Sequence, residues 1–342
     1  MANSWKILII VCLFFIWFYE GECSENNLIQ IIEEQFFLDW KLDEDIINKF
    51  AFSLAKEEYS LVGENQKYIL MNDNDPKQLW LFKVGKPLAL IVEEVTSRWG
   101  KLCGLNLPYV HKISLPINNV MVRGTIQQML CNPEAINDIK NLNFSQKDGL
   151  QRYFIFDYFV MNNDSLKNHF LIVKDYGKLY GIDEDDGFYQ DVNLIKKNEL
   201  SEFFFEDVES FVCDEYADFW NLYINKEIKI DFKKGLTLAS FMKNLNDCMV
   251  YKIFNPMFET EEIPSSDSIE KLIYKKNILY EKITNFYRVL SKQQGEYFSG
   301  AVSNKEISDY EIELLGKIEQ GINEKTVLLG KLKEKSILNR KI

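Results

Sequence analysis

The first apolar feature of the chain is an unbroken run over residues 7–19, behind a short start that carries Lys6. A helix over this run would reach only about 20 Å, whereas a bilayer core of about 30 Å needs roughly 20 apolar residues. Gly21 and Cys23 then supply small side chains of the kind that signal peptidase prefers. The pattern predicts a signal peptide over residues 1–23 with cleavage near Cys23; a buried apolar N-terminal helix is the alternative.

Helical periodicity dominates the next segment, residues 24–60. A second amphipathic run covers residues 46–54. The apolar residues at helical spacing in the first run are Leu28, Ile31, Ile32, Phe36 and Phe37. We expect an N-terminal helical segment here.

A small β-rich lobe with one helix is expected over residues 61–130. Its first two strands flank a polar turn, and its helix ends at Gly104, a suitable C-terminal residue. The predicted elements are strands at 68–71 and 79–84, a helix at 88–103, and two short strands within 110–122.

The remainder, residues 131–342, is expected to be a mainly helical lobe with a helical C-terminal extension. A helix over residues 148–161 is apolar nearly all round and therefore buried. Two short strands should follow it, and the chain beyond residue 198 has a helical, polar-faced pattern. The strands are predicted at 169–173 and 178–182, and breaks in the helical part at Pro256, 264–268 and 295–300. The fold class is thus α+β with two lobes.

Composition limits the classes of partner. The hydrophobic content of 46% and aromatic content of 14% are those of a folded protein. A formal net charge of -12 gives no support to a nucleic-acid partner. It would also slow approach to an anionic membrane, although a local basic patch can override the total charge.

Cysteine and histidine usage leaves few metal-site classes open. The spacings of Cys103, Cys131, Cys213 and Cys248 match no zinc pattern. In an oxidising compartment these residues could form two disulfides, and buried free thiols are the alternative. Because the chain has only 2 histidines, a multi-histidine metal site is excluded.

The stretch from Phe156 to Phe188 carries the most informative polar residues. Asp164 follows the predicted buried helix, further polar residues come shortly after it, and Asp183 follows the predicted strand pair. Phosphoryl transfer needs one aspartate to orient or deprotonate the attacking hydroxyl, and oxygen ligands to hold Mg²⁺ against the nucleotide phosphates. The pattern therefore indicates a metal-phosphate site.

This stretch resembles the catalytic and metal loops of the atypical kinases that include type II phosphatidylinositol 4-kinases, actin-fragmin kinase and HipA-like kinases. The matching residues are Phe156, Asp157, Asn162, Asp164, Leu171, Ile172, Ile182, Asp183 and Phe188. The resemblance implies a protein-kinase-like fold, with Asp164 as the catalytic aspartate and Asp183 as a metal ligand. It also implies ATP and Mg²⁺ or Mn²⁺ as cofactors. The secreted CotH-like kinases are a neighbouring family.

Upstream motifs resemble the same family in the same order. Lys83 matches the strand lysine that binds the ATP phosphates, and Glu93 or Glu94 the helix glutamate that pairs with it, with Glu94 preferred. The strand over residues 123–127 resembles the one that leads into the segment between the lobes. The resemblance therefore implies nucleotide contacts by Gln127, Met129 and Leu130.

Two departures from the family pattern bear on activity. His169 stands where the family has its metal-binding Asn, and Asn168 lies one residue earlier, so both are candidate metal ligands. Imidazole suits Mg²⁺ less well than an amide oxygen does, while Mn²⁺ tolerates nitrogen better. Ser165 and Leu166 replace the Arg and His that follow the family's catalytic aspartate.

Three hypotheses of function follow. The first is an exported kinase that acts on a protein, lipid or small-molecule hydroxyl, secreted or held in the lumen of the secretory pathway. The second is a secreted pseudokinase that serves as a binding or regulatory module. The third is a secreted interaction protein in which the kinase motifs are coincidental.

Overall fold

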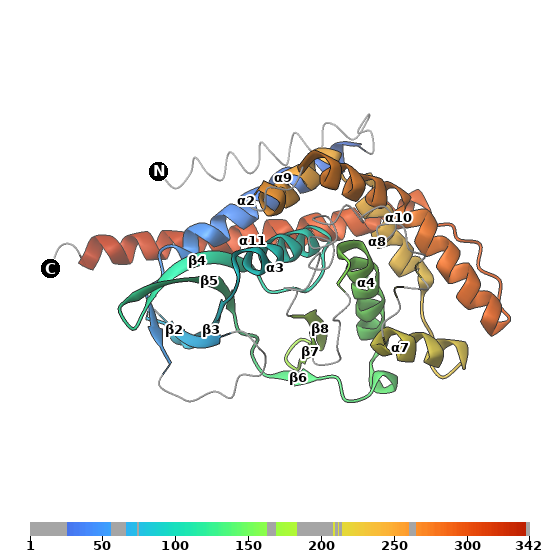
Figure 1. Cartoon of the computed structure of the whole chain (residues 1–342), viewed down its shortest axis with the longest axis horizontal. Coiled ribbons are helices and arrows are strands. Elements are labelled where there is room, and N and C mark those ends of the chain that lie inside the picture. The colour runs from blue at the N-terminus through green and yellow to red at the C-terminus, as the bar shows by residue number, and fades with distance from the viewer. Residues whose placement is uncertain are drawn as a thin grey trace.

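The computed structural model describes residues 26–55, 66–73, 75–162, 169–182, 208, 211, 214–259 and 265–339. A sheet gathers at one end of the molecule and helices at the other (Figure 1). The predicted signal peptide lies outside the described residues. No helix of the described part combines the length and apolar character needed to cross a bilayer.

The sheet lobe is built on five antiparallel strands in the order β1-β2-β3-β5-β4. The strands are β1 (Phe52–Leu54), β2 (Gln66–Asn72), β3 (Asp75–Val84), β4 (Val110–Ile117) and β5 (Val120–Gln128). Because side chains alternate between the faces of a strand, β3 divides its residues between two environments. Trp80 and Phe82 enter an apolar cluster on one face, and Lys83 lies on the other.

The helix inserted between β3 and β4 is α3 (Pro87–Leu102). A proline at the first helical position suits the start, because its fixed φ is helical and its missing N–H needs no partner there. Gly104 follows the end with φ of +72°, the left-handed conformation that glycine adopts without strain. The predicted helix and its C-terminal glycine are confirmed.

Strands β4 and β5 form one long hairpin. The two short strands were predicted within residues 110–122, whereas β5 continues to Gln128. The turn of the hairpin is Asn118-Asn119, both with positive φ, which is the conformation that matches the twist of paired strands. Asparagine tolerates this conformation better than most residues.

The second lobe is mainly helical and holds the larger core. Its helices are α4 (Phe144–Val160), α7 (Asp214–Ile224), α8 (Phe232–Asn244), α9 (Asp247–Glu259), α10 (Ser265–Gln294) and α11 (Asn304–Asn339). Helix α4 is buried on most of its surface and begins with a capping box, in which Asn143 and Gln146 satisfy each other's backbone N–H groups. A small sheet joins this lobe to the other through β6 (Pro133–Ala135), β7 (Phe170–Val173) and β8 (Lys178–Gly181).

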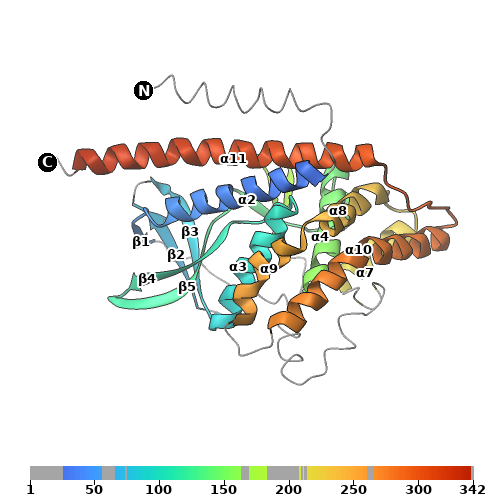
Figure 2. The same ribbon diagram turned by 90° about the horizontal axis from the view of Figure 1, so that it is seen from above.

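Helix α2 (Asn26–Ile47) lies beside α11 along the length of the molecule, and the two run in the same direction (Figure 2). Both extend from the helical lobe to the sheet lobe. Lys325 of α11 contacts Asp39 of α2 at 3.0 Å. The pair of helices therefore links the lobes on one side of the molecule.

Two predicted elements are wrong. The run at residues 46–54 is not a second helix: α2 ends at Ile47, and residues 52–54 pair with β2 as β1. Phe50 and Phe52 pack edge-on against Trp80, so tertiary contacts with the sheet override the helical spacing. Pro256 does not end α9: the helix continues past it to Glu259.

The predicted break at 264–268 is wrong in part, because α10 begins at Ser265, whereas the expected fold class is confirmed. The chain has the α+β, two-lobed arrangement expected, with a small antiparallel lobe followed by a mainly helical one. Cys103, Cys131 and Cys248 carry free thiols, which favours the free-thiol alternative for these three residues. Cys213 lies outside the described residues.

We predict that Gly124→Ala destabilises the sheet lobe. An added Cβ would lie 2.3 Å from the backbone oxygen of Lys83 and 2.7 Å from the Phe82 ring, so β3 and β5 would have to separate. Overpacking of this kind costs about 1–3 kcal/mol, measurable as a lower free energy of unfolding in urea.

Gly316→Ala in α11 is the matched control. Nothing lies within 4 Å of a Cβ there, and alanine in a helix is about 0.5–1 kcal/mol more favourable than glycine. Equal stabilities for the two variants would contradict the close approach of the strands at Gly124.

Candidate functional site

Lys83 lies near the end of β3 on the face opposite the apolar cluster. Its partner across the sheet is Thr125 of β5, and Leu81 pairs with Gln127 in the same register. Residues directly opposite in a sheet share a face, so Lys83, Thr125 and Gln127 all lie on this side, which we call the lysine face.

The lysine pairs with Glu93 of α3 and not with Glu94, the preferred candidate from the sequence. The Lys83 ammonium lies 2.5 Å from Oε1 of Glu93, and the two residues are only 4% and 2% exposed. Thr125 donates its hydroxyl hydrogen bond to the other carboxylate oxygen of Glu93 at 2.5 Å. Glu93 thus joins β3, α3 and β5 at one point.

Glu94 is turned toward other groups. Its carboxylate lies 3.7 Å from Arg98 one turn along α3 and 3.7 Å from Lys112 of β4. Successive residues of an α-helix are about 100° apart, so only one of two neighbouring glutamates can face the lysine. The packing of α3 against the sheet decides which one.

The predicted nucleotide contacts lie along and just beyond β5. The side-chain oxygen of Gln127 is buried and has no hydrogen-bond partner among the described residues. Met129 donates its backbone N–H to the Leu79 carbonyl at 3.0 Å, so that N–H is already used. Leu130 follows in the connection to the helical lobe.

The end of α4 leads into the predicted catalytic loop. Asp157 is buried and accepts a hydrogen bond from Tyr216 at 2.5 Å, while its carbonyl accepts one from the Asn162 N–H at 3.0 Å. Met161 turns the chain out of the helix with φ of 57°. Asp164 and Asn168 come directly after and lie outside the described residues.

His169, a predicted metal ligand, is joined by a backbone hydrogen bond to Ile182, the residue before Asp183. The Ile182 N–H donates to the His169 carbonyl at 2.8 Å, and Asp183, the next residue, lies outside the described part. Nδ1 of His169 is buried and has no hydrogen-bond partner within that part. Among described residues, no three His, Cys, Asp or Glu side chains cluster as a metal site would require.

A cavity of about 310 Å³ lies where the two lobes meet, and we call it the hinge cavity. It is lined by residues 128–131, which connect β5 to β6, and by parts of both lobes. Lys83 and Glu93 do not line it. The hinge cavity is therefore separate from the lysine face.

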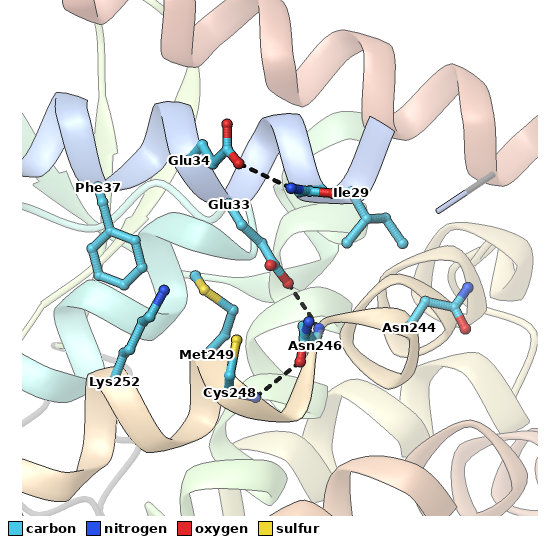
Figure 3. Close-up of a pocket in the computed structure, with 10 residues that line it drawn as sticks. Ile29, Glu33, Glu34, Phe37, Asn244, Asn246, Cys248, Met249 and Lys252 are labelled. Carbon is cyan, nitrogen blue, oxygen red and sulfur yellow. Dashed lines mark hydrogen bonds between the residues drawn. The ribbon is translucent and has the colours of Figure 1, made fainter. Parts of the chain in front are cut away.

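A second cavity, of about 500 Å³, lies between α2 and the start of α9 (Figure 3). Glu33 points into it and accepts the backbone N–H of Asn246 at 2.8 Å, just before α9 begins. Burial raises the pKa of Glu33, and this hydrogen bond opposes the rise. A carboxylate at a helix N-terminus is stabilised there, so Glu33 has a structural role.

Sequence reasoning missed Thr125 as the second partner of the glutamate. The signal was a small hydroxyl residue between apolar positions of a buried strand, Gly124-Thr125-Ile126. It also missed a polar cluster between α2, β4 and α11, because its members are far apart in the chain. The members are Asp39, Asp43, Tyr109, His111 and Lys325.

Comparisons with known proteins show only distant similarity. No protein-family profile matches the sequence, and no curated protein matches it. Among solved structures, the Helicobacter pylori proinflammatory kinase CtkA is similar to this chain, with 14% identity and a TM-score of 0.41. The match covers 71% of this chain and 95% of that one. At this level the match assigns neither a family nor an activity.

Proposed function

We propose that this protein is a kinase-like phosphotransferase that binds ATP at the lysine face. The observation that carries the proposal is the buried Lys83–Glu93 pair, completed by the Thr125 hydroxyl. In protein kinases a strand lysine must pair with a helix glutamate to be held toward the nucleotide phosphates. Three elements meet here to fix one ammonium group.

Stability alone is a weak reason for such a pair. Removing two charges from water costs several kcal/mol per ion, and apolar residues of similar volume often stabilise a fold as well or better. A fully buried lysine that is oriented by a carboxylate therefore favours a functional role. The Gln127 oxygen on the same face has no hydrogen-bond partner within the described part of the chain, which supports a polar ligand beside it.

The nucleotide would lie with its phosphates at Lys83 and its base near the connection between the lobes. Since the Met129 N–H is bonded to Leu79, the backbone of Leu130 is the better candidate to meet adenine. Gln127 lies between these two positions along β5.

Asp183, with Asn168 or His169, would hold Mg²⁺ or Mn²⁺, which neutralises charge on the phosphates during transfer. Nδ1 of His169, which has no hydrogen-bond partner among the described residues, fits a nitrogen donor at this place, and nitrogen suits Mn²⁺ better than Mg²⁺. Asp164 would accept the proton of the acceptor hydroxyl as its oxygen bonds to the γ-phosphorus and ADP leaves. The acceptor is a protein, lipid or small-molecule hydroxyl, met after export.

A pseudokinase is the second candidate. The observation in its favour is His169 at the position of the family's Asn ligand, since a poorer Mg²⁺ ligand could leave nucleotide binding without turnover. Both candidates predict nucleotide binding and differ in phosphate transfer.

We predict that Glu93→Gln weakens binding of ATP with Mg²⁺ by about tenfold or more, because Lys83 loses its orienting carboxylate. Glu94→Gln is the matched control, one residue along the same helix, and should bind ATP like the wild type. The measurement is the shift in melting temperature with increasing ATP, which reports affinity. An equal loss of ATP affinity in both variants would contradict the assignment of Glu93 as the partner of Lys83. Unchanged ATP affinity in Glu93→Gln would contradict the proposed site.

We predict different effects for the two aspartates. Asp183→Asn should abolish metal-dependent stabilisation by ATP, because a metal ligand contributes to binding in the ground state. Asp164→Asn should leave that stabilisation largely intact and remove phosphate transfer, measured with radiolabelled ATP.

His169→Asn restores the family's ligand and should raise transfer supported by Mg²⁺ relative to that supported by Mn²⁺. If the wild type binds ATP but transfers phosphate with neither metal, and His169→Asn changes nothing, the pseudokinase is the correct reading. If the wild type does not bind ATP, both candidates fail.

A further inference from the structure

The hinge cavity has walls from both lobes and from the connection between them. Its aromatic lining comes from the sheet lobe on one side and from the β7–β8 hairpin on the other, and α3 adds one ammonium group. The residues that matter here are Trp80, Tyr109, Tyr176, Tyr180 and Lys101. A volume of about 310 Å³ is enough for a small molecule.

The cavity opens on the opposite side of the sheet from the lysine face. Trp80 and Lys83 are three residues apart on β3, so their side chains point to opposite faces. Trp80 pairs with Gln128, which also lines the cavity, whereas Lys83 pairs with Thr125. A ligand here would not contact Lys83, but it would share Leu130, the proposed adenine contact, with a bound nucleotide.

Lys101, in the last turn of α3, is the unusual member of the lining. Its ammonium group lies 4.4 Å from the centre of the Tyr109 ring. Within the part of the chain that the structure describes, it has no hydrogen bond or ion pair. Burial, and then repulsion from Lys325, lower the pKa of Lys101 to about 8. An anion beside Lys101 would relieve both effects.

The nearest carboxylates are already engaged by other groups. Lys325 lies 3.0 Å from Asp39 and 3.5 Å from Asp43. Asp43, which also lines the cavity, bonds to His111 at 2.7 Å, and Asp39 accepts the Tyr109 hydroxyl. Asp43 and Asp39 attract Lys101 electrostatically, but each bonds directly to other partners and neither forms an ion pair with Lys101 among the described residues.

We propose that the hinge cavity is a binding site for a small aromatic carboxylic acid. The four aromatic side chains supply flat apolar walls for a ring, and Lys101 supplies the cation for the carboxylate. Because the walls belong to both lobes, a bound acid holds the lobes in one relative position.

The test uses 2-naphthoate as the probe and the full chain at pH 7, with binding measured by isothermal titration calorimetry. We expect saturable 1:1 binding to the wild type. Lys101→Met should weaken it by about tenfold or more, since one partner of a charge pair is lost. Lys101→Arg, which keeps the positive charge, should bind within about threefold of the wild type.

Two controls separate charge recognition from other causes. Lys112→Met removes a lysine from neighbouring β4 that does not line the cavity, and should bind 2-naphthoate like the wild type. The neutral analogue 2-naphthylmethanol should bind the wild type about tenfold more weakly than 2-naphthoate. Equal binding of the two compounds would overturn the proposal.

The proposal also fails if millimolar 2-naphthoate does not bind, or if Lys101→Met binds it as well as the wild type does. If Lys101→Met does not fold, the test rests on two other measurements. Lys101→Arg must bind 2-naphthoate, and the wild type must bind 2-naphthylmethanol more weakly than 2-naphthoate. ATP binding measured in parallel keeps this outcome apart from the proposed function: Glu93→Gln should lose ATP and retain 2-naphthoate.

Discussion

The buried ion pair between Lys83 and Glu93 is the interaction on which the sheet lobe depends. A carboxylate and an ammonium group at this depth are each costly without the other, so the strand and the helix that carry them must stay in register. Thr125 extends the same constraint to β5 by occupying the second carboxylate oxygen. The position of α3 on the sheet is therefore fixed by polar contacts as well as by apolar packing.

The opposite face of the sheet is covered by apolar packing. Trp80 and Phe82 pack there with the end of α2 and the aromatic residues after it. A polar cluster that ties α2 to α11 lies beside this apolar packing, with Lys325 between Asp39 and Asp43. The two faces of one sheet thus serve separate purposes: one positions the charged groups proposed to meet the nucleotide, and the other anchors the helices that connect the lobes.

Much of this architecture could be predicted from local patterns, because strand alternation and helical spacing act over a few residues. The strand that carries Lys83, the helix ended by Gly104 and the buried helix α4 all follow from such patterns. The choice between Glu93 and Glu94 could not be predicted, since it depends on the rotation of α3 against the sheet. The strand at residues 52–54 could not be predicted either, because the contact of Phe52 with Trp80 is made only in the folded protein.

The pairing of α2 with α11 has a consequence for how the chain folds. Asp39 and Lys325 are separated by 286 residues, so their contact can form only after synthesis has reached α11. Contacts over such sequence distances slow folding, because the entropy of closing the loop is lost before any contact is gained. Among the described residues, the ion pair of Asp39, which is only 2% exposed in the folded protein, is made with Lys325 of α11. The contact between α2 and α11 therefore forms late, and the docking of α11 completes the link between the lobes.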